Sequence, residues 1–284
     1  MSERVFVIGP GHVGRGLVRA FRASGVEVVG LHDKRPSGVA TSTGNIPADA
    51  ARANVVIVSV RDPQLDETLE EVILAANDGR IARGTAILHT SAIAEPAAFA
   101  RLSAAGFPTG TFHPLVPFSD PEVSAELLRR GWIGVDGDNA ARNASRRIAG
   151  HLGARVLEIP PGRKPAYHAA AVISSNFPVV LASVAGHLLH DIGIPDASAY
   201  QAVESLMSGA LANMKQTLPD DALTGPVVRG DAETVAKHLR ALQGQSAASE
   251  VYRALSAAAV EIAERRGVDP KKLAAVSGLV RTAR

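Results

Sequence analysis

The chain has 284 residues, of which 46% are hydrophobic and 20% are charged. This balance predicts a globular protein of one large or two ordinary domains, because disorder requires low hydrophobicity and high net charge. Thirty basic and 28 acidic residues leave a net charge of +2, which does not favour nucleic acid as a partner. The absence of cysteine excludes disulfide frameworks, cysteine zinc sites and thiolate catalysis, and it fits a cytoplasmic location.

One uncharged segment raises the question of a membrane. The N-terminal residues lack the long apolar region and cleavage site of a signal peptide. Pro165–Ser183 carries no formal charge and approaches the length that spans a bilayer. Because this segment contains His168, Asn176 and Pro178, which are unfavourable in hydrocarbon, we expect a buried helix of a soluble protein and no membrane partner.

The first half of the chain alternates short β-branched runs with helical patterns. Such alternation is typical of βαβ units, in which a parallel sheet carries helices on both faces. Strands are predicted at Val5–Ile8, Glu27–Leu31, Val55–Val60, Thr85–His89, Gly110–Phe112, Trp132–Val135 and Arg155–Ile159. Helices are predicted at Gly14–Ala23, Pro63–Asn77, Glu95–Ala105 and Asn139–Leu152.

A segment rich in proline and glycine, Ile159–Pro165, separates this pattern from the second half. Beyond it helical patterns dominate. Helices are predicted at Ala166–Ile192, Ala197–Gln216, Ala232–Gln243, Ala247–Arg266 and Pro270–Thr282. The sequence therefore predicts an α/β domain with a mostly parallel, doubly wound sheet at residues 1–162. An all-α domain for substrate binding and dimerisation is predicted at residues 163–284.

A glycine-rich motif follows the first predicted strand and precedes the first predicted helix. The first glycine of G-x-G-x-x-G permits a tight turn, the second admits a pyrophosphate, and the third allows close packing of helix on strand. The helix N-terminus then faces the anion. An ordinary glycine-rich turn, or the loop of a flavoprotein or methyltransferase, is the alternative. We predict a Rossmann-like fold in which a dinucleotide contacts Gly9, Pro10, Gly11, His12, Val13 and Gly14.

The end of the second predicted strand bears on the choice of cofactor. Asp33 stands where an acidic side chain would bind the ribose 2′-hydroxyl of NAD. Lys34 and Arg35 could instead bind the 2′-phosphate of NADP, or they could be solvated loop charges. Two cations against one anion favour NADP, with NAD as the alternative cofactor.

Several segments together resemble predicted oxidoreductases that join a Rossmann-like domain to a helical domain of unknown function. The resemblance covers approximately residues 4–260. It extends to the 6-phosphogluconate dehydrogenase-like superfamily, which includes pyrroline-5-carboxylate reductase, prephenate dehydrogenase and ketopantoate reductase. It implies NAD(P) binding and hydride transfer, without a defined substrate. The segments are Gly9–Gly14, His113-Pro114-Leu115, Tyr167–Ala170 with Ser175-Asn176-Phe177, and Leu223–Asp231 with His238 and Leu242.

One motif of these relatives is not conserved in its spacing. The β-hydroxyacid dehydrogenases carry Lys-x-x-x-Asn on the first helix after the Rossmann domain. Here Lys164 stands four residues before His168, and Asn176 stands eight residues after it. The catalytic lysine of these relatives is therefore not assigned to Lys164 from the resemblance.

Polar residues follow three predicted strands. Ser59 and Val60 end the third strand, Thr90 and Ser91 follow the fourth, and His113 follows the fifth. Because ligands bind beyond the carboxyl ends of parallel strands, we expect Ser59, Val60 and Thr90 to contact the cofactor. The resemblance to prephenate dehydrogenase implies that Ser91 and His113 contact the substrate. His113 is the predicted proton donor, and a structural histidine bonded to a loop carbonyl is the alternative.

The first helix of the second half carries a polar stripe of His168, Ser175 and Asn176. We predict that His168 and Asn176 take part in catalysis and that Ser175 binds substrate. A structural role, in which Asn176 bonds backbone and His168 packs against an interdomain carbonyl, is equally supported. Pro178 predicts a kink in this helix.

A sharply punctuated loop lies at Leu223–Asp231. Asp231 is expected to cap the following helix, on which His238 shares its face. Arg229 suits a carboxylate or phosphate, although a surface salt bridge is the alternative. We predict that Thr224, Arg229, Asp231 and His238 contact the substrate.

The leading hypothesis is an NAD(P)-dependent oxidoreductase that transfers a hydride to or from a small carbonyl, imine or hydroxy acid between the two domains. The alternatives are a dinucleotide-binding sensor or regulator, and a structural dimerisation protein with a relic Rossmann fold. The alanine-rich second domain favours a homodimer. No metal site is predicted, because His and carboxylate residues show no recognised ligand spacing.

Overall fold

The computed structural model describes residues 3–281. Its contacts divide the chain into two compact units between Ser175 and Asn176. The predicted boundary near residue 162 marks the end of the sheet. The division comes later because the first turns of the next helix pack on that sheet.

In the part of the chain that the structure describes, an eight-stranded sheet forms the framework of the first unit. The first six strands are parallel, which agrees with the predicted parallel sheet, although the two-residue strand Ser42–Thr43 was not predicted; β7 is antiparallel to β6, and β8 is parallel to β7. The order is β3-β2-β1-β4-β5-β6-β7-β8. The strands are β1 (Arg4–Ile8), β2 (Glu27–Asp33), β3 (Ser42–Thr43), β4 (Val55–Val58), β5 (Ala86–His89), β6 (Thr109–Pro114), β7 (Trp132–Gly137) and β8 (Arg155–Glu158).

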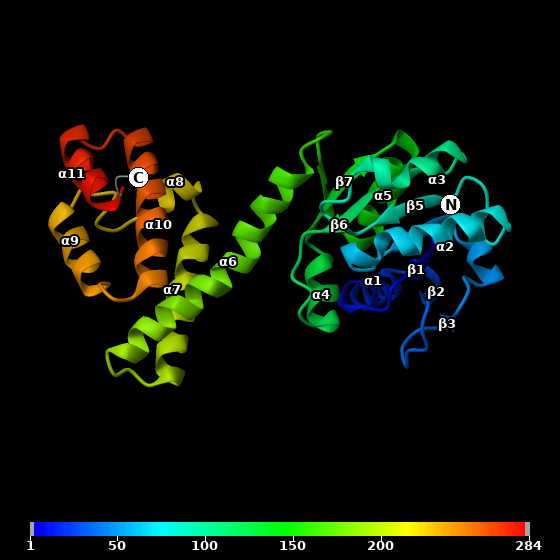
Figure 1. The fold of residues 1–284 in the computed structure, drawn as a ribbon, viewed down its shortest axis with the longest axis horizontal. Coiled ribbons are helices and arrows are strands. Elements are labelled where there is room, and N and C mark those ends of the chain that lie inside the picture. Colours follow the sequence, from blue (N-terminus) through cyan, green and yellow to red (C-terminus); the bar gives the residue numbers. More distant parts are fainter. Residues whose placement is uncertain (1–2, 282–284) are drawn as a thin grey trace. The chain divides into compact units, whose positions relative to one another are not determined.

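Helices cover both faces of this sheet, and each face has its own buried core (Figure 1). One face packs against α1 (His12–Ala23), α4 (Pro121–Leu128) and α5 (Asn139–Leu152). The other packs against η1 (Ala48–Arg52), α2 (Leu65–Asn77), η3 (Pro96–Phe99) and α3 (Ala100–Ala104). A short turn, η2 (Asp62–Gln64), precedes α2. This arrangement confirms the predicted doubly wound α/β fold.

Two helical predictions in this unit need correction. The single helix predicted at Glu95–Ala105 is a 3₁₀ turn followed by the short α3. The helix α4 was not predicted, although its start carries a clear signal. The Asp120 carboxylate accepts from the backbone N–H groups of Glu122 and Val123, and Pro121 occupies the first helical position.

The second unit is all-α over the described residues, as predicted, and its predicted helices agree with the expected ranges within about two residues, whereas a short helix at Pro219–Ala222 was not predicted. Val235 of α9, Val260 of α10 and Leu273 of α11 belong to its core. The predicted end of the last helix, Thr282, lies outside the described residues. The helices are α6 (Lys164–Asp191), which begins in the first unit, α7 (Asp196–Met214), α8 (Pro219–Ala222), α9 (Ala232–Ala241), α10 (Ser246–Arg265) and α11 (Pro270–Val280).

The exposure of α6 differs from the prediction. By length and composition it is apolar enough to cross a membrane, with a mean hydropathy of 1.6, a test that core helices of soluble proteins also pass. Only 6% of its most apolar stretch is buried within the chain. The predicted buried helix is therefore wrong for a single chain.

Candidate functional site

The glycine-rich loop joins β1 to α1 as the motif requires. Gly9 has φ of +103°, a conformation that side chains disfavour. A Cβ on Gly14 would lie 1.9 Å from the carbonyl oxygen of Gly9, so only glycine permits the close approach of helix to turn. A Cβ on Gly11, by contrast, would have no atom of the described residues within 4 Å apart from its chain neighbours and the adjoining helix backbone. The loop therefore presents bare backbone toward open space at the N-terminus of α1.

Ser59 supports this loop from beneath. Its buried hydroxyl lies 2.9 Å from the carbonyl oxygens of both Ile8 and Gly9, to which it donates. This hydroxyl fixes the turn, and the predicted contact of Ser59 with the cofactor stays a prediction.

The other loop and strand-end residues have mixed positions. Pro10, Val13 and Thr90 are partly exposed at the same edge, and the backbone N–H of Thr90 donates to Val58. His12 is exposed, and its Nδ1 lies 2.9 Å from the carbonyl oxygen of Phe118. None of these side chains is an unpaired cation, so the backbone N–H groups of the loop are its main anion-binding groups.

A cavity of 260 Å³ lies beside the glycine-rich loop. Val60, Asp33, Lys34 and Arg35 line it together with Gly9, as expected for the part of a dinucleotide site that holds the ribose. The remaining wall was not predicted. It consists of Ile8 of β1, Gln64 of η2, and Glu67, Thr68 and Glu71 of α2.

Lys34 is not a free cation in this cavity. Its Nζ forms ion pairs with Glu67 and, at 2.5 Å, with Glu71. These carboxylates raise the pKa of Lys34, the hydrogen bond to Glu67 being the main cause. The prediction that Lys34 awaits a phosphate was incomplete, because the sequence did not reveal these partners.

His113 lies at the carboxyl edge of the sheet, where the prediction placed it. The register aligns Ile8, Val58, His89 and Thr111 across four strands, and His113 follows two residues later. Its Nδ1 lies 2.7 Å from the hydroxyl of Tyr167.

The protonation state of His113 differs from the expectation for a proton donor. Burial, reinforced by the charge of His168, lowers the pKa of His113 to about 4, although Asp62 opposes the shift. His113 is therefore uncharged at neutral pH. An uncharged imidazole can accept a proton, whereas it is a poor acid.

Two side chains of α6 complete this group. The ring centroids of His113 and His168 are 6.3 Å apart. Nδ1 of His168 is buried and has no hydrogen-bond partner among residues 3–281. Tyr167 was missed as a site residue, and its hydroxyl occupies the space above Gly134, where a Cβ would lie 2.0 Å from it. Gly134 stands opposite His113 in the β6–β7 register, a pairing that the sequence alone did not reveal.

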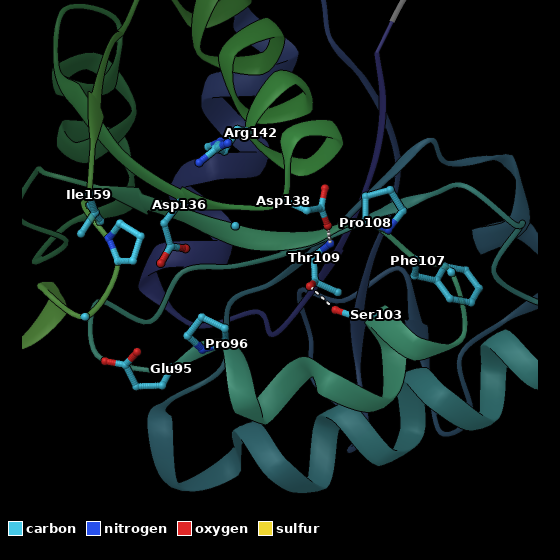
Figure 2. A pocket seen from close by; sticks show the side chains of 14 residues that line it. Glu95, Pro96, Ser103, Phe107, Pro108, Thr109, Asp136, Asp138, Arg142 and Ile159 are labelled. Atoms are coloured by element: carbon cyan, nitrogen blue, oxygen red, sulfur yellow. Dashed lines mark hydrogen bonds between the residues drawn. The ribbon is translucent and has the colours of Figure 1, made fainter.

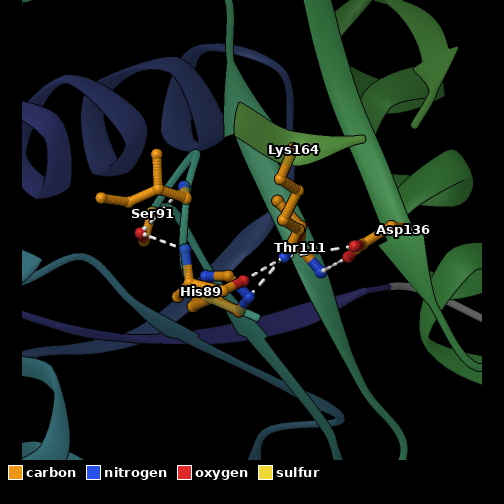
Figure 3. Close-up of polar contacts among 7 residues, drawn as sticks. His89, Ser91, Thr111, Asp136 and Lys164 are labelled. Atoms are coloured by element: carbon orange, nitrogen blue, oxygen red, sulfur yellow. Dashed lines mark hydrogen bonds and ion pairs between the residues drawn. The ribbon is translucent and has the colours of Figure 1, made fainter. Parts of the chain in front are cut away.

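A row of polar side chains from His89, Thr111, Asp136 and Lys164 lies across the sheet (Figure 3), and Thr111 stands two residues before His113 on β6. Nε2 of His89 lies 3.1 Å from Oγ1 of Thr111, whose N–H donates to Asp136. The Nζ of Lys164 lies 3.1 Å from Oδ2 of Asp136 and also donates to the carbonyl of Ala94. Lys164 thus fixes the first turn of α6 to the sheet.

Ser91 has a local role in the adjoining loop. It is 9% exposed, and its Oγ accepts from the N–H groups of Ile93, at 3.3 Å, and Ala94, at 3.0 Å. The predicted substrate contact is untested, and the oxygen already stabilises the turn that leads to the carbonyl bound by Lys164.

A larger cavity, of 650 Å³, lies at the opposite, amino edge of β6 (Figure 2). Among its lining residues, Asp138 accepts from the N–H of Thr109 at 2.7 Å, and the hydroxyls of Thr109 and Ser103 are 2.7 Å apart. We place the candidate site at the carboxyl edge, because the glycine-rich loop and His113 lie there.

The remaining predicted residues belong to α6 and to the second unit. Ser175 is exposed and donates to the carbonyl of Ala171, and Asn176 is the exposed first residue of the second unit. Asp231 caps α9, as predicted, because its Oδ1 accepts from the N–H of Thr234 at 3.0 Å. Nδ1 of His238 lies 2.9 Å from the hydroxyl of Tyr252. Both Thr224 and Arg229 are exposed.

Comparisons with known proteins agree with the fold. Residues 132–259 match a domain of unknown function, DUF2520. A proposed NADP oxidoreductase from Bacteroides fragilis is 20% identical, with 91% of this chain and 98% of that chain covered and a TM-score of 0.69. A Thermotoga maritima protein is 22% identical, with coverages of 93% and 99% and a TM-score of 0.65. No curated protein matches the chain.

A third structure ties the fold to the predicted relatives. Pyrroline carboxylate reductase from Plasmodium falciparum, solved with NADP bound, is 11% identical. The match covers 97% of this chain and 98% of that chain, with a TM-score of 0.63. These likenesses confirm the predicted resemblance to proteins that join a Rossmann-like domain to a helical domain of unknown function.

Proposed function

We propose that the chain is an NADP-dependent oxidoreductase, with NAD as a second cofactor, that acts on a small carbonyl, imine or hydroxy acid. The observation that carries this proposal is the open backbone of Gly11 at the N-terminus of α1, at the same sheet edge as His113. The NADP bound to the Plasmodium falciparum relative supports the cofactor.

The residues at this edge fit the parts of a dinucleotide. The turn at Gly9 and Gly11 would hold the pyrophosphate, because bare N–H groups at a helix N-terminus bind anions. Asp33 and Arg35, with Lys34, would meet the ribose. When bound, a nicotinamide cofactor supplies or accepts the hydride.

The chain itself supplies the proton chemistry in this proposal. Uncharged His113 accepts a proton at neutral pH when a hydroxyl or amine is oxidised, and Tyr167 holds its ring through the hydrogen bond at Nδ1. In the opposite direction His113 must first gain a proton. His168, which faces it across the edge, adds a second titratable group.

Titration calorimetry with NADP⁺ and NAD⁺, followed by turnover on a panel of 2-keto acids, 2-hydroxy acids and cyclic imines, tests the proposal. We expect His113→Asn to preserve dinucleotide affinity and to lower turnover by about 10²–10⁴-fold. His151→Asn, which changes an exposed histidine of α5, is the matched control. Dinucleotide binding without turnover on any substrate would favour a sensor or regulator instead.

We also propose that the second unit binds a second copy of the chain. Val179 and Val180 of α6 and Leu206 and Leu211 of α7 are 70%, 52%, 75% and 58% exposed. None of these four belongs to the core of the second unit, so α6 and α7 expose large apolar side chains that a partner chain would cover.

Light scattering during size exclusion tests this partner. A homodimer is expected, and Leu206→Glu should dissociate it because a carboxylate would be buried. Gln201→Glu adds the same charge at another exposed position of α7 and is the control. A monomeric wild type that binds liposomes would contradict the proposal and indicate a membrane partner.

A further inference from the structure

Two glutamates of one helix share the lysine of the candidate ribose site. Glu67 and Glu71 stand one turn apart on α2, so their side chains project from the same face. Both form ion pairs with Nζ of Lys34, and all three side chains line the 260 Å³ cavity beside Gly9. Glu71 is the less exposed carboxylate, at 22% against 64% for Glu67.

The cavity contains more carboxylates than cations, and this balance disfavours a bound phosphate. Its wall carries three carboxylates, those of Asp33, Glu67 and Glu71, against the two cations of Lys34 and Arg35. A phosphate monoester brings a charge of about −1.5 to −2 at pH 7. The carboxylates would repel this phosphate, and the phosphate would have to compete with Glu67 and Glu71 for Lys34.

A ribose hydroxyl is not repelled by the carboxylates and does not compete for Lys34. It carries no charge, and a carboxylate such as Asp33 can accept its hydrogen bond. The same wall therefore treats the two dinucleotides differently, because only one of them competes with Glu67 and Glu71 for Lys34.

We propose that Glu67 and Glu71 are specificity-determining residues that weaken binding of NADP relative to NAD by retaining Lys34. This inference rests on the proposed function of the loop as a dinucleotide site. Under it, the chain uses both cofactors, since Lys34 and Arg35 attract the 2′-phosphate while the two glutamates oppose it.

The test is calorimetric titration of NADP⁺ and NAD⁺ into the full chain and into Glu67→Gln/Glu71→Gln. Glutamine keeps the length of the side chain and removes its charge. We expect the Kd of NADP⁺ to fall by about fivefold, the upper end of the effect of one exposed ion pair, and that of NAD⁺ to change less than about twofold.

Glu70→Gln is the matched control. Glu70 neighbours Glu71 on α2 but pairs with Arg101 and does not line the cavity, so the variant removes one carboxylate charge of the same helix outside the site. Its ratio of the two Kd values should equal that of the wild type. Circular dichroism and thermal unfolding establish that each variant is folded.

A second comparison isolates the role of Lys34. Lys34→Met should weaken NADP⁺ binding more in the Glu67→Gln/Glu71→Gln background than in the wild type, because the free lysine then serves the phosphate. The inference is overturned if the glutamine variants weaken NADP⁺ binding, which would mean that the glutamates orient Lys34 toward the phosphate.

It is also overturned if both dinucleotides change equally. A wild-type chain that binds neither dinucleotide would instead refute the proposed function, and this inference with it. Binding of both with an unaltered ratio refutes the inference alone.

Discussion

Removing the charge of Asp136 should destabilise the first unit more than removing that of Lys164. The Lys164 side chain is 2% exposed, and its charge is offset by Asp136 at 3.1 Å and by the carbonyl of Ala94. Asp136→Asn would leave a buried ammonium without its counter-ion. Breaking a buried pair in this way costs about 3–5 kcal/mol.

Removing the lysine instead, in Lys164→Met, leaves the carboxylate of Asp136 unpaired, and this charge is better solvated than the buried ammonium. Asp136 is 14% exposed, lines the 650 Å³ cavity and still accepts from the N–H of Thr111. Lys164→Met also places apolar atoms where the lysine stem was buried. We therefore expect a cost of about 1–2 kcal/mol, and the double variant Lys164→Met/Asp136→Asn should be more stable than Asp136→Asn alone.

Urea unfolding followed by fluorescence measures these differences. Trp132 is the sole tryptophan of the sequence and belongs to β7, so its signal reports on the first unit. A loss of 3 kcal/mol should lower the midpoint by about 1–3 M urea. Glu126→Gln, which removes an exposed pair with Arg129, should cost less than about 1 kcal/mol. An Asp136→Asn variant as stable as Lys164→Met would refute the reasoning.

Three further outcomes follow from the site. Gly11→Val should abolish dinucleotide binding in calorimetry, and its melting temperature should not change, because the valine side chain meets only open space. Gly14→Val should instead unfold at a lower temperature. If folded Gly11→Val keeps its affinity for the dinucleotide, the loop is not the anion site. Burial lowers the pKa of His89 to about 3 and that of His113 to about 4, below the unfolded value of 6.5. Their stabilisation is therefore complete above pH 6.5 and declines as pH falls toward 4 and 3, so urea midpoints should drop over this range less steeply in His89→Gln/His113→Gln; an equal slope would contradict this origin. Tyr167→Phe should change the ¹⁵N shifts of the His113 imidazole by removing its partner at Nδ1; identical spectra would show that the tyrosine does not set the tautomer.

The parts of the fold that sequence predicted well depend on local signals. The apolar run of β4 indicated a strand buried on both faces, and it is fully buried. The glycine spacing at Gly9, Gly11 and Gly14 indicated a strand, turn and helix in that order, and the structure has them. Each signal lies within about ten residues, the range in which backbone geometry restricts the side chains directly.

The missed features depend on contacts distant in sequence. The direction of β7 could not be predicted, because an apolar run has the same pattern in either direction. Tyr167 meets His113 across 54 residues, and Lys34 meets Glu67 across 33 residues. Neither pair belongs to a periodic pattern, so only the assembled sheet and α2 bring the side chains together.

The antiparallel direction of β7 also fixes how many residues can separate Lys164 from Tyr167 at the start of α6. Since β8 is parallel to β7, the chain leaves the sheet at its amino edge and α6 starts there. The helix then places Lys164 against Asp136 and, one turn later, Tyr167 against His113. Deleting one residue between Lys164 and Tyr167 would rotate the tyrosine by about 100° relative to the lysine. Insertions and deletions should therefore be tolerated in the turn at residues 160–163, which precedes the helix, and excluded from the single turn that separates the ion pair from the candidate catalytic edge.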